Sequence, residues 1–452
     1  MPSMENLRRQ GLIWVLLCAA ISIVWGTWFA QSGNAWIDFR AVYAGTRCLM
    51  HRHNPYEVRD LAREYGAEDG QRPPATPLHI QSITLYVNMP TTFMIVAPFA
   101  ALPWEPAHIL WMLFTGCVFV LALLLMWRVG AQYAPRVSTI LICVLAFNCE
   151  SIFGGGNTAG MVVGLCGIAV WCFLKGRWVR IGILCLAVSL AVKPHDAGLV
   201  WLYFVLAGGA NRKRALQSVL VTAIIGVAAA VWVSHVAPTW VHDWRANLAT
   251  ISAPGGINDP GPDAVKDGSL YSIVDLQAAV SIFCDFPRLY NAATYLLCGV
   301  LVLLWSLWTL RTEFSDPNAW LALPVAATLS LLITYHRLWD AKLVMLAVPG
   351  CCLLWAEGGR TAKAAMLITS TAILATGEIS LVILEAIVAT FHPSKTWTAG
   401  PLITAALIRP APLALLVMAI FYLLAYVEHG RQLRASPSSV GTCIGRRYEL
   451  GR

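Results

Sequence analysis

Long apolar segments recur along almost the whole chain and restrict its fold more than any other feature. A helix needs about 20 apolar residues to cross a bilayer. The mean hydropathy of +0.64, with 12% charged residues, agrees with many such crossings. We therefore predict an all-α polytopic membrane protein, with one transmembrane domain over residues 1–434. About twelve spans are expected, at 11–30, 107–127, 137–153, 159–174, 181–192, 197–209, 215–234, 288–310, 318–334, 341–356, 364–390 and 402–427.

The basic residues lie in short clusters between the apolar segments, which is typical of topology determinants and not of a nucleic-acid interface. Segments 181–192 and 197–209 are short, and we interpret residues 193–196 between them as the polar apex of a broken hairpin. With the N-terminus inside, every dense cluster then falls on one side. We expect an integral plasma (inner) membrane protein with both termini in the cytoplasm and a disordered cytoplasmic tail over 435–452. The clusters are Arg128 and Arg136; Lys175, Arg177 and Arg180; Arg212, Lys213 and Arg214; Arg311, Arg360 and Lys363; and Arg431 and Arg434.

This topology places two long loops on the outer face, at 31–106 and 235–287, whereas the inner loops are short. The first outer loop is expected to contain juxtamembrane helices. Its apolar run at 93–103 is bounded by prolines, and we assign it to a membrane-surface or re-entrant helix. Cys48 and Cys284 would both lie outside, where a disulfide between them is an open alternative. The working face is therefore expected to be extracytoplasmic.

Asp38 directly follows the first apolar segment. A carboxylate at the edge of the hydrocarbon costs free energy unless it is paired or used. Asp38, Arg40, Tyr43 and Arg47 have helical spacing, so one face of a short helix is expected to present an acid, a base and a phenol together. We interpret Asp38 as a catalytic base. The alternative is that Asp38 caps this helix and pairs with Arg40 or another cation.

Cations and other polar groups recur in the outer turns. Lys193 ends a short apolar run before a proline, and His336 and Arg337 lie between two apolar segments. Ammonium and guanidinium groups neutralise phosphoryl oxygens, so these residues are candidates for binding a phosphate that arrives on a lipid. The alternative is an interfacial charge cluster that pairs internally. The substrate-binding candidates are Arg40, Tyr43, Asn157, Tyr335 and Asp340.

No metal or other cofactor is expected. His235, His242 and Asp243 match no zinc spacing, and no cysteine lies near them. Residues 154–156 are glycines, but neither Gly-Lys-Ser nor Gly-Lys-Thr follows, so they do not form a P-loop. Since no soluble nucleotide-binding motif is evident, an activated donor would have to come from the membrane. We expect metal-independent chemistry and no nucleic-acid partner.

Several short strings carry a family resemblance: DFRAVYAGTRCLMHRHNPYEV from residue 38, the run that ends APFAALPW, GGGN at 154–157, SLAVKP, and YHRLWDAKLVMLAVPG from residue 335. With the order of apolar segments, they resemble glycosyltransferase family 87 over about residues 11–427. Members of this family are integral membrane enzymes of the GT-C fold, similar to polyprenyl-phosphate-mannose-dependent mannosyltransferases. One position departs from the family. Gly155 stands where the usual Gly-Gln-x-Asn turn has glutamine, so any contact from that side chain is lost.

The resemblance implies a GT-C-type bundle in which Asp38 takes the place of the acidic base. It also implies that Lys193, His336 and Arg337 lie near the donor phosphate. The implied reaction transfers a hexose, most directly mannose, from polyprenyl phosphate to a lipid or glycan acceptor with inversion. The implied partners are that donor, the acceptor and membrane lipids. Two alternatives stay open, namely a transporter or lipid-linked sugar flippase, and a GT-C enzyme for another sugar such as arabinofuranose.

Overall fold

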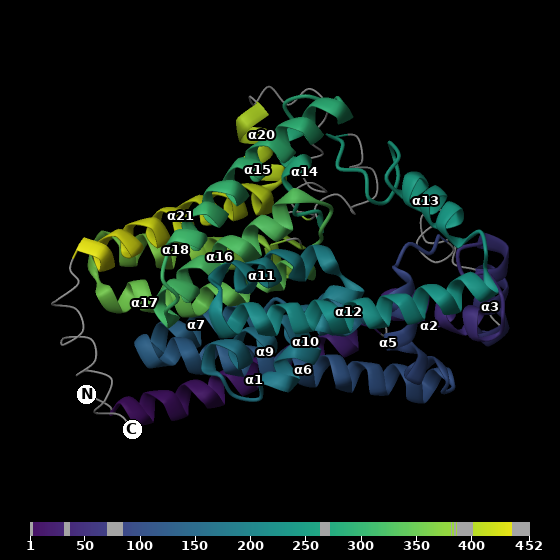
Figure 1. Cartoon of the computed structure of the whole chain (residues 1–452), viewed down its shortest axis with the longest axis horizontal. Helices are drawn as coiled ribbons and strands as arrows, with labels where there is room; N and C mark the ends of the chain where they lie inside the picture. The colour runs from purple at the N-terminus through teal and green to yellow at the C-terminus, as the bar shows by residue number, and fades with distance from the viewer. Residues whose placement is uncertain are drawn as a thin grey trace.

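Helices make up nearly all of the described chain in this computed structural model, and one isolated antiparallel bridge joins Ile273 to Arg337. The structure describes residues 3–30, 37–69, 85–262, 272–380, 382–383, 386 and 401–435. The all-α prediction is confirmed for these residues. Figure 1 shows long helices lying side by side, with α2, α3 and α13 together at one end. The helices are α1 (Met4–Ala30), α2 (Ile37–Met50), α3 (Val58–Asp69), α5 (Pro90–Ala100), α6 (Trp104–Tyr133), α7 (Pro135–Phe147), α8 (Glu150–Gly155), α9 (Thr158–Lys175), α10 (Val179–Val192), α11 (Pro194–Ala207), α12 (Gly209–Val236), α13 (Trp240–Ile251), α14 (Leu276–Val280), α15 (Pro287–Arg311), α16 (Asp316–Ile333), the 3₁₀ helix η3 (Asp340–Ala347), α17 (Val348–Glu357), α18 (Gly359–Ala375), α20 (Pro401–Ile408) and α21 (Pro410–Ala435).

Among the described residues, eight helical segments are long and apolar enough to cross a bilayer. They coincide with eight of the twelve predicted spans. The other four predicted spans correspond to α10, α11, η3 with α17, and α18, each of which falls short in length or in regular α-helical geometry. The described residues therefore show a multi-pass protein with eight candidate spans, and the further four predicted spans are not shown. The eight candidates are 4–28, 104–133, 135–155, 158–175, 209–236, 287–311, 316–333 and 410–432.

The short helices α10 and α11 run antiparallel, as the broken-hairpin interpretation requires. Near the start of α12, Arg214 donates to the Phe173 carbonyl at the end of α9 (2.6 Å). The start of α10 and the end of α11 therefore lie at the same end of the bundle. Between them Lys193 leaves the helical conformation (φ −138°, ψ 81°), and Pro194 begins α11 where its missing N–H leaves no bond unmade. The chain reverses at Lys193.

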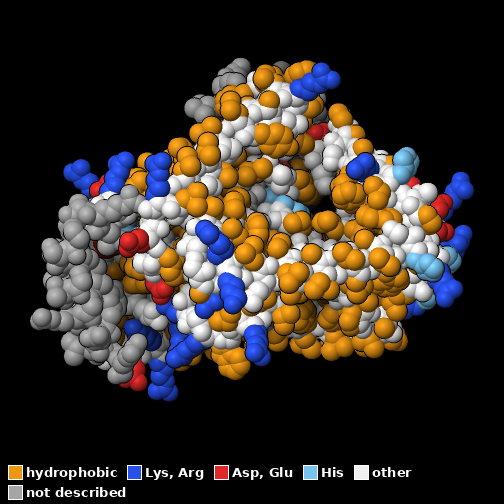
Figure 2. Space-filling view, in the orientation of Figure 1, with side chains coloured by type: hydrophobic (Ala, Val, Ile, Leu, Met, Phe, Trp, Pro, Cys, Tyr) orange, Lys and Arg blue, Asp and Glu red, His pale blue; other side chains and the backbone are white. Residues whose placement is uncertain are grey.

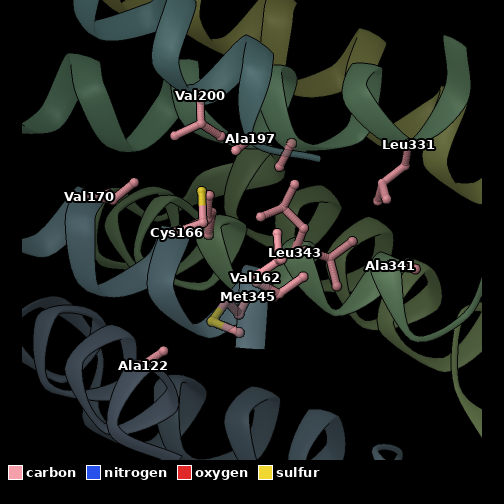
Figure 3. Close-up of a cluster of buried hydrophobic side chains, with 14 of the residues drawn as sticks. Ala122, Val162, Cys166, Val170, Ala197, Val200, Leu331, Ala341, Leu343 and Met345 are labelled. Atoms are coloured by element: carbon pink, nitrogen blue, oxygen red, sulfur yellow. The ribbon is translucent and has the colours of Figure 1, made fainter. Parts of the chain in front are cut away.

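Small residues allow α9 to pass through the centre of the bundle. An added Cβ would come 2.3 Å from a neighbouring side chain at Gly160 and 2.8 Å from one at Gly164, so α9 approaches α8 and α6 very closely. Figure 3 shows Val162 of α9 and Met345 of η3 in the same buried cluster. This packing fixes the positions at which α9 and η3 begin, and the polar groups of the site lie at those two points.

The apolar run predicted at 93–103 forms α5, which packs against α2 and α12. The Thr91 hydroxyl of α5 donates to the Ala191 carbonyl near the end of α10. At eleven residues α5 is too short to be a candidate span. Cys48 is buried in α2 and Cys284 is partly exposed, and both are free thiols, so the disulfide alternative is not realised. The predicted tail at 435–452 lies outside the described residues, apart from Ala435 at the end of α21.

The two ends of the bundle give a test of orientation. His242 of α13 and Arg177 in the turn after α9 are both exposed. The 28-residue helix α12 begins beside Phe173, close to Arg177, and leads to α13, so the two positions lie at opposite ends. The positive-inside rule places the Arg177 end in the cytoplasm. We expect His242→Cys to react with an impermeant maleimide added to intact cells, and Arg177→Cys to react only after permeabilisation. The unsubstituted protein supplies the background from native thiols. If only Arg177→Cys were labelled in intact cells, the orientation would be opposite to the predicted one.

Candidate active site

A polar turn between α8 and α9 holds Asn157 against Asp38. Gly156 has a φ of 63°, a left-handed conformation that favours glycine, and it lets the chain pass directly from α8 into α9. Asn157 then caps α9, because its Oδ1 accepts from the Ala159 N–H (2.8 Å). Its Nδ2 donates to Asp38 Oδ2 (2.9 Å). Since Oδ1 faces a backbone donor, the orientation of the amide is fixed, and its NH₂ end faces the carboxylate.

Aromatic packing holds α2 against the same turn. Phe39 stacks on Trp111 with ring centroids 4.9 Å apart, and Trp111 Nε1 donates to the Gly156 carbonyl (2.8 Å). A Cβ at Gly155 would lie 3.3 Å from Asp38 Oδ2, so the missing side chain leaves room beside the carboxylate. These contacts position Asp38 through its neighbours in α2 on one side and through the glycine turn on the other.

Lys193 continues the network on the other side of Asn157. Its Nζ lies 3.4 Å from Asn157 Oδ1 and 2.5 Å from Asp340 Oδ1. Only 13% of the Lys193 side chain and 3% of the Asp340 side chain are exposed. Burial alone lowers the pKa of Lys193, but the carboxylates of Asp340 and Asp196 raise it overall, so the ammonium form persists. One chain of hydrogen bonds thus joins Asp38 to Asp340 through an amide and an ammonium group.

Asp38 remains partly exposed at one end of this chain. Burial raises the pKa of Asp38 above its ordinary value, although the Asn157 hydrogen bond and the charges of Arg337 and Lys193 oppose part of that rise. A carboxylate whose pKa is raised is a better proton acceptor than a free one. Asp38 is therefore both accessible and suited to act as a base.

His336 lies deeper than Lys193, and its side chain is fully buried. Its Nδ1 lies 2.7 Å from the Thr334 carbonyl, and its Nε2 lies 2.9 Å from Asp196 Oδ1. Burial alone lowers the pKa of His336, but the Asp196 carboxylate raises it above its ordinary value. Positive charge is therefore favoured next to Asp196.

Arg337 connects the site to the segment between α13 and α14. Its Nη1 donates to Ser272 Oγ (2.9 Å), its Nη2 donates to the Ile257 carbonyl (2.7 Å), and its Nε donates to the Tyr335 hydroxyl. The backbone N–H of Arg337 also donates to Asp340 Oδ2 (2.9 Å). Each nitrogen of the guanidinium thus has a protein partner, and Arg337 acts on the site through its charge and by holding this loop.

The structure brings together most of the predicted site residues. Asp38, Asn157, Lys193 and Asp340 share the hydrogen-bonded chain, and residues 335–337 adjoin it through Asp340. Sequence spacing does not reveal this proximity, because the residues come from α2, the turn before α9, the α10–α11 apex and the start of η3. The tertiary packing of α9 and η3 creates it.

Tyr43 bonds to groups outside this chain, and Arg40 lies over aromatic rings. The buried Tyr43 hydroxyl donates to the Leu102 carbonyl (2.8 Å) and accepts from Arg47 (3.2 Å). The Arg40 guanidinium lies over the ring of Trp104 (5.2 Å). The expectation that one face of the helix presents Asp38 and Tyr43 together is therefore wrong. The reason is geometric, because five residues rotate an α-helix by about 140°.

Sequence reasoning does not single out Asp196 or the buried ion pair between Lys342 and Glu378 (3.0 Å). Glu378 also accepts from the Ser151 hydroxyl of α8, so this ion pair supports the helix that precedes the α8–α9 turn. The sequence nevertheless contains a signal for Asp196 and for Glu378. Asp196 belongs to the predicted apex at 193–196, and a carboxylate inside a predicted span is unusual enough to require a partner.

The sequence model described as Glycosyltransferase family 87 matches residues 86–334, which is more than half of the chain. Asn157 and Lys193 lie inside the matched segment, whereas Asp38 lies before it and residues 335–340 follow it directly. No match was found among curated proteins.

The Lys193–Asp340 ion pair gives a prediction for stability. Lys193→Met leaves Asp340 buried without its cation, which should cost roughly 3–5 kcal/mol. We expect a clearly lower unfolding temperature for the purified protein in detergent. The double variant Lys193→Met with Asp340→Asn should recover most of the loss, because asparagine is neutral and still accepts from the Arg337 N–H. Equal unfolding temperatures for the single and double variants would contradict this account of the pair.

Proposed function

Because the chain belongs to glycosyltransferase family 87, it is a membrane glycosyltransferase, and we propose that it transfers a hexose from a polyprenyl-phosphate donor. The proposed sugar is mannose, and the proposed acceptor is a hydroxyl of a lipid or glycan at the extracytoplasmic face. The observation that carries the proposal is the placement of Asp38 and Lys193 on opposite ends of the Asn157 amide. A base and a cation held this close suit a reaction in which an acceptor loses a proton while a phosphate leaves.

In the proposed reaction Asp38 accepts the proton of the acceptor hydroxyl. The acceptor oxygen forms a bond to the anomeric carbon as the bond from that carbon to the phosphate oxygen breaks. The polyprenyl phosphate departs with the bonding electrons, and attack from the opposite face inverts the configuration. Lys193 and the charges of His336 and Arg337 behind it stabilise the phosphate. Asn157 orients Asp38, so base and phosphate site are positioned by one side chain.

The remaining substrate contacts are proposed at the edge of this network. Tyr335 is partly exposed beside Arg337, and Asp340 holds Lys193 in place. In the proposal Arg40 and Tyr43 support α2, since Arg40 lies over the ring of Trp104 and the Tyr43 hydroxyl donates to the Leu102 carbonyl. The substrate-binding group in the proposal is thus Asn157, Tyr335 and Asp340.

A lipid donor suits the surface around the site. Figure 2 shows a hollow above α12, between α13 and the α14–α15 region, with histidine atoms at its inner edge and apolar side chains around it. The helices α12 and α15 are mostly unburied and carry exposed residues such as Leu220, Ile224 and Leu296. A polyprenyl chain lying along such a surface would allow its phosphate to enter the hollow from the side.

Asp38→Asn tests the base directly. General-base catalysis is typically worth about a hundred- to ten-thousand-fold, so the rate of labelled mannose transfer from polyprenyl phosphate should fall by about that factor. The unfolding temperature should stay close to that of the unsubstituted protein, because asparagine can still accept from Asn157. Asp285→Asn is the matched control, since Asp285 is an exposed carboxylate outside the network. A normal rate in Asp38→Asn would remove Asp38 from the mechanism, and movement of the sugar lipid without covalent transfer would favour a transporter.

The pH dependence gives a second test. Asp38 must be deprotonated to accept a proton, so kcat/KM should fall as the pH drops through its folded-state pKa, which lies above the ordinary 3.8. Asn157→Ser keeps an N-cap acceptor for α9 but removes the amide that stabilises the charged carboxylate. The acidic limb should therefore move to higher pH in this variant. An unchanged or lower apparent pKa would show that the limb belongs to another group.

A further inference from the structure

A neutral His336 does not explain its close contact with Asp196. His336 Nδ1 lies 2.7 Å from the Thr334 carbonyl, so Nδ1 carries a hydrogen. In a neutral ring, Nε2 then has only a lone pair. That lone pair lies 2.9 Å from a carboxylate oxygen, and two acceptors at this separation repel each other. A positive species has to lie between or beside them.

A protonated His336 alone does not account for this contact. Nε2 and Asp196 Oδ1 are 2.9 Å apart, yet neither Asp196 oxygen nor His336 Nε2 has a hydrogen-bond partner among the described residues. Both residues are fully buried, with 0% of each side chain exposed. Buried carboxylate and imidazole atoms without hydrogen bonds are costly unless a cation compensates them.

His195 supplies a third donor atom at the same place. Its ring centroid lies 4.8 Å from that of His336, and ligand atoms of His195, Asp196 and His336 all lie within 4.8 Å of one another. Two ligands bound to one first-row metal ion at about 2.1 Å lie roughly 2.9–3.4 Å apart. The Asp196–His336 separation already meets that requirement. The side chain of His195 is exposed, so rotation can bring its nitrogen closer.

We propose that His195, Asp196 and His336 bind one divalent first-row transition metal ion, of the class of Zn²⁺ or Mn²⁺. Two imidazoles and one carboxylate suit these ions better than Ca²⁺ or Mg²⁺, which prefer oxygen ligands. The Thr334 carbonyl at Nδ1 is the outer partner that a metal-binding histidine typically has. The ion joins the start of α11 to the turn before η3, and these two segments carry Lys193 and Asp340. Its role is to clamp the phosphate side of the site, without taking part in the proton transfer to Asp38.

Metal binding can be measured without an activity assay. The full-length protein is purified in detergent with a tag that contains no histidine, stripped with chelator, and titrated with Zn²⁺ and with Mn²⁺ by calorimetry. We expect about one equivalent of one of these ions to bind and to raise the unfolding temperature. His195→Ala should weaken binding at least tenfold. This variant is expected to fold, because the side chain is exposed, and His242→Ala is the matched exposed control that should bind as the unsubstituted protein does.

A second measurement separates the proposed ligands from other histidines. Co²⁺ bound by imidazole and carboxylate gives a visible absorption spectrum, which should form in the unsubstituted protein and in His242→Ala and be absent or shifted in His195→Ala. Asp196→Asn should also lose tight binding, although the isosteric amide preserves the shape of the pocket. Neither ion binding in a saturable way, or His195→Ala binding as tightly as the unsubstituted protein, would overturn the proposal. In that case a proton on His336, together with the nearby Lys193 ammonium group, would balance the charge of Asp196.

Discussion

The side-chain amide of Asn157 is the contact on which the arrangement of the site depends. It caps α9, donates to Asp38 and lies within hydrogen-bonding distance of Lys193. The amide has one donor end and one acceptor end, and each end faces the group of complementary polarity. A carboxylate and an ammonium group are thereby kept apart, although without this spacer they would attract each other into a direct ion pair. Asp38 stays available as an acceptor because Asn157 occupies the position where a cation would otherwise sit.

Buried charge sets the second constraint. Lys193, Asp340, Asp196 and His336 are all at or near full burial, and each lies against a group of opposite polarity. The segments that carry these groups are joined to the bundle by close packing of α9 against α6 and η3. Loss of one partner would leave an uncompensated charge in a region of low polarity. The same contacts that organise the site therefore also stabilise the fold around it.

Hydropathy was sufficient to predict the helical class and the position of eight candidate spans, because each is a long uninterrupted apolar run. It could not settle the number of crossings. The segments at 181–192 and 341–356 form short or 3₁₀ helices whose polar residues are paired inside the protein, and their length alone does not distinguish a crossing from a buried helix. The reversal at Lys193 was predictable, since a proline follows a lysine at the end of an apolar run. A reversal there also places all dense clusters of basic residues on one side of the membrane.

The candidate site was predictable in its members but not in its contacts. Asp38, Asn157 and Lys193 are polar residues at the boundaries of apolar segments, which makes them visible in the sequence. Their mutual bonds follow from tertiary packing and could not be read from spacing. Tyr43 shows the limit of spacing most clearly, because helical periodicity places its side chain about 140° from Asp38 and the structure binds it to Leu102 instead.

The 3₁₀ geometry of η3 changes how far its segment of chain can reach. A 3₁₀ helix rises about 2.0 Å per residue and an α-helix about 1.5 Å. The eight residues of η3 therefore advance about 16 Å, and the ten residues of α17 advance about 15 Å. Together they cover roughly 30 Å, the thickness of the hydrocarbon core of a bilayer. An ordinary α-helix would need about two more residues to cover the same distance. Because η3 is extended, Asp340 at its start contacts Lys193, while Glu357 at the end of α17 lies beside His429 of α21 (3.7 Å).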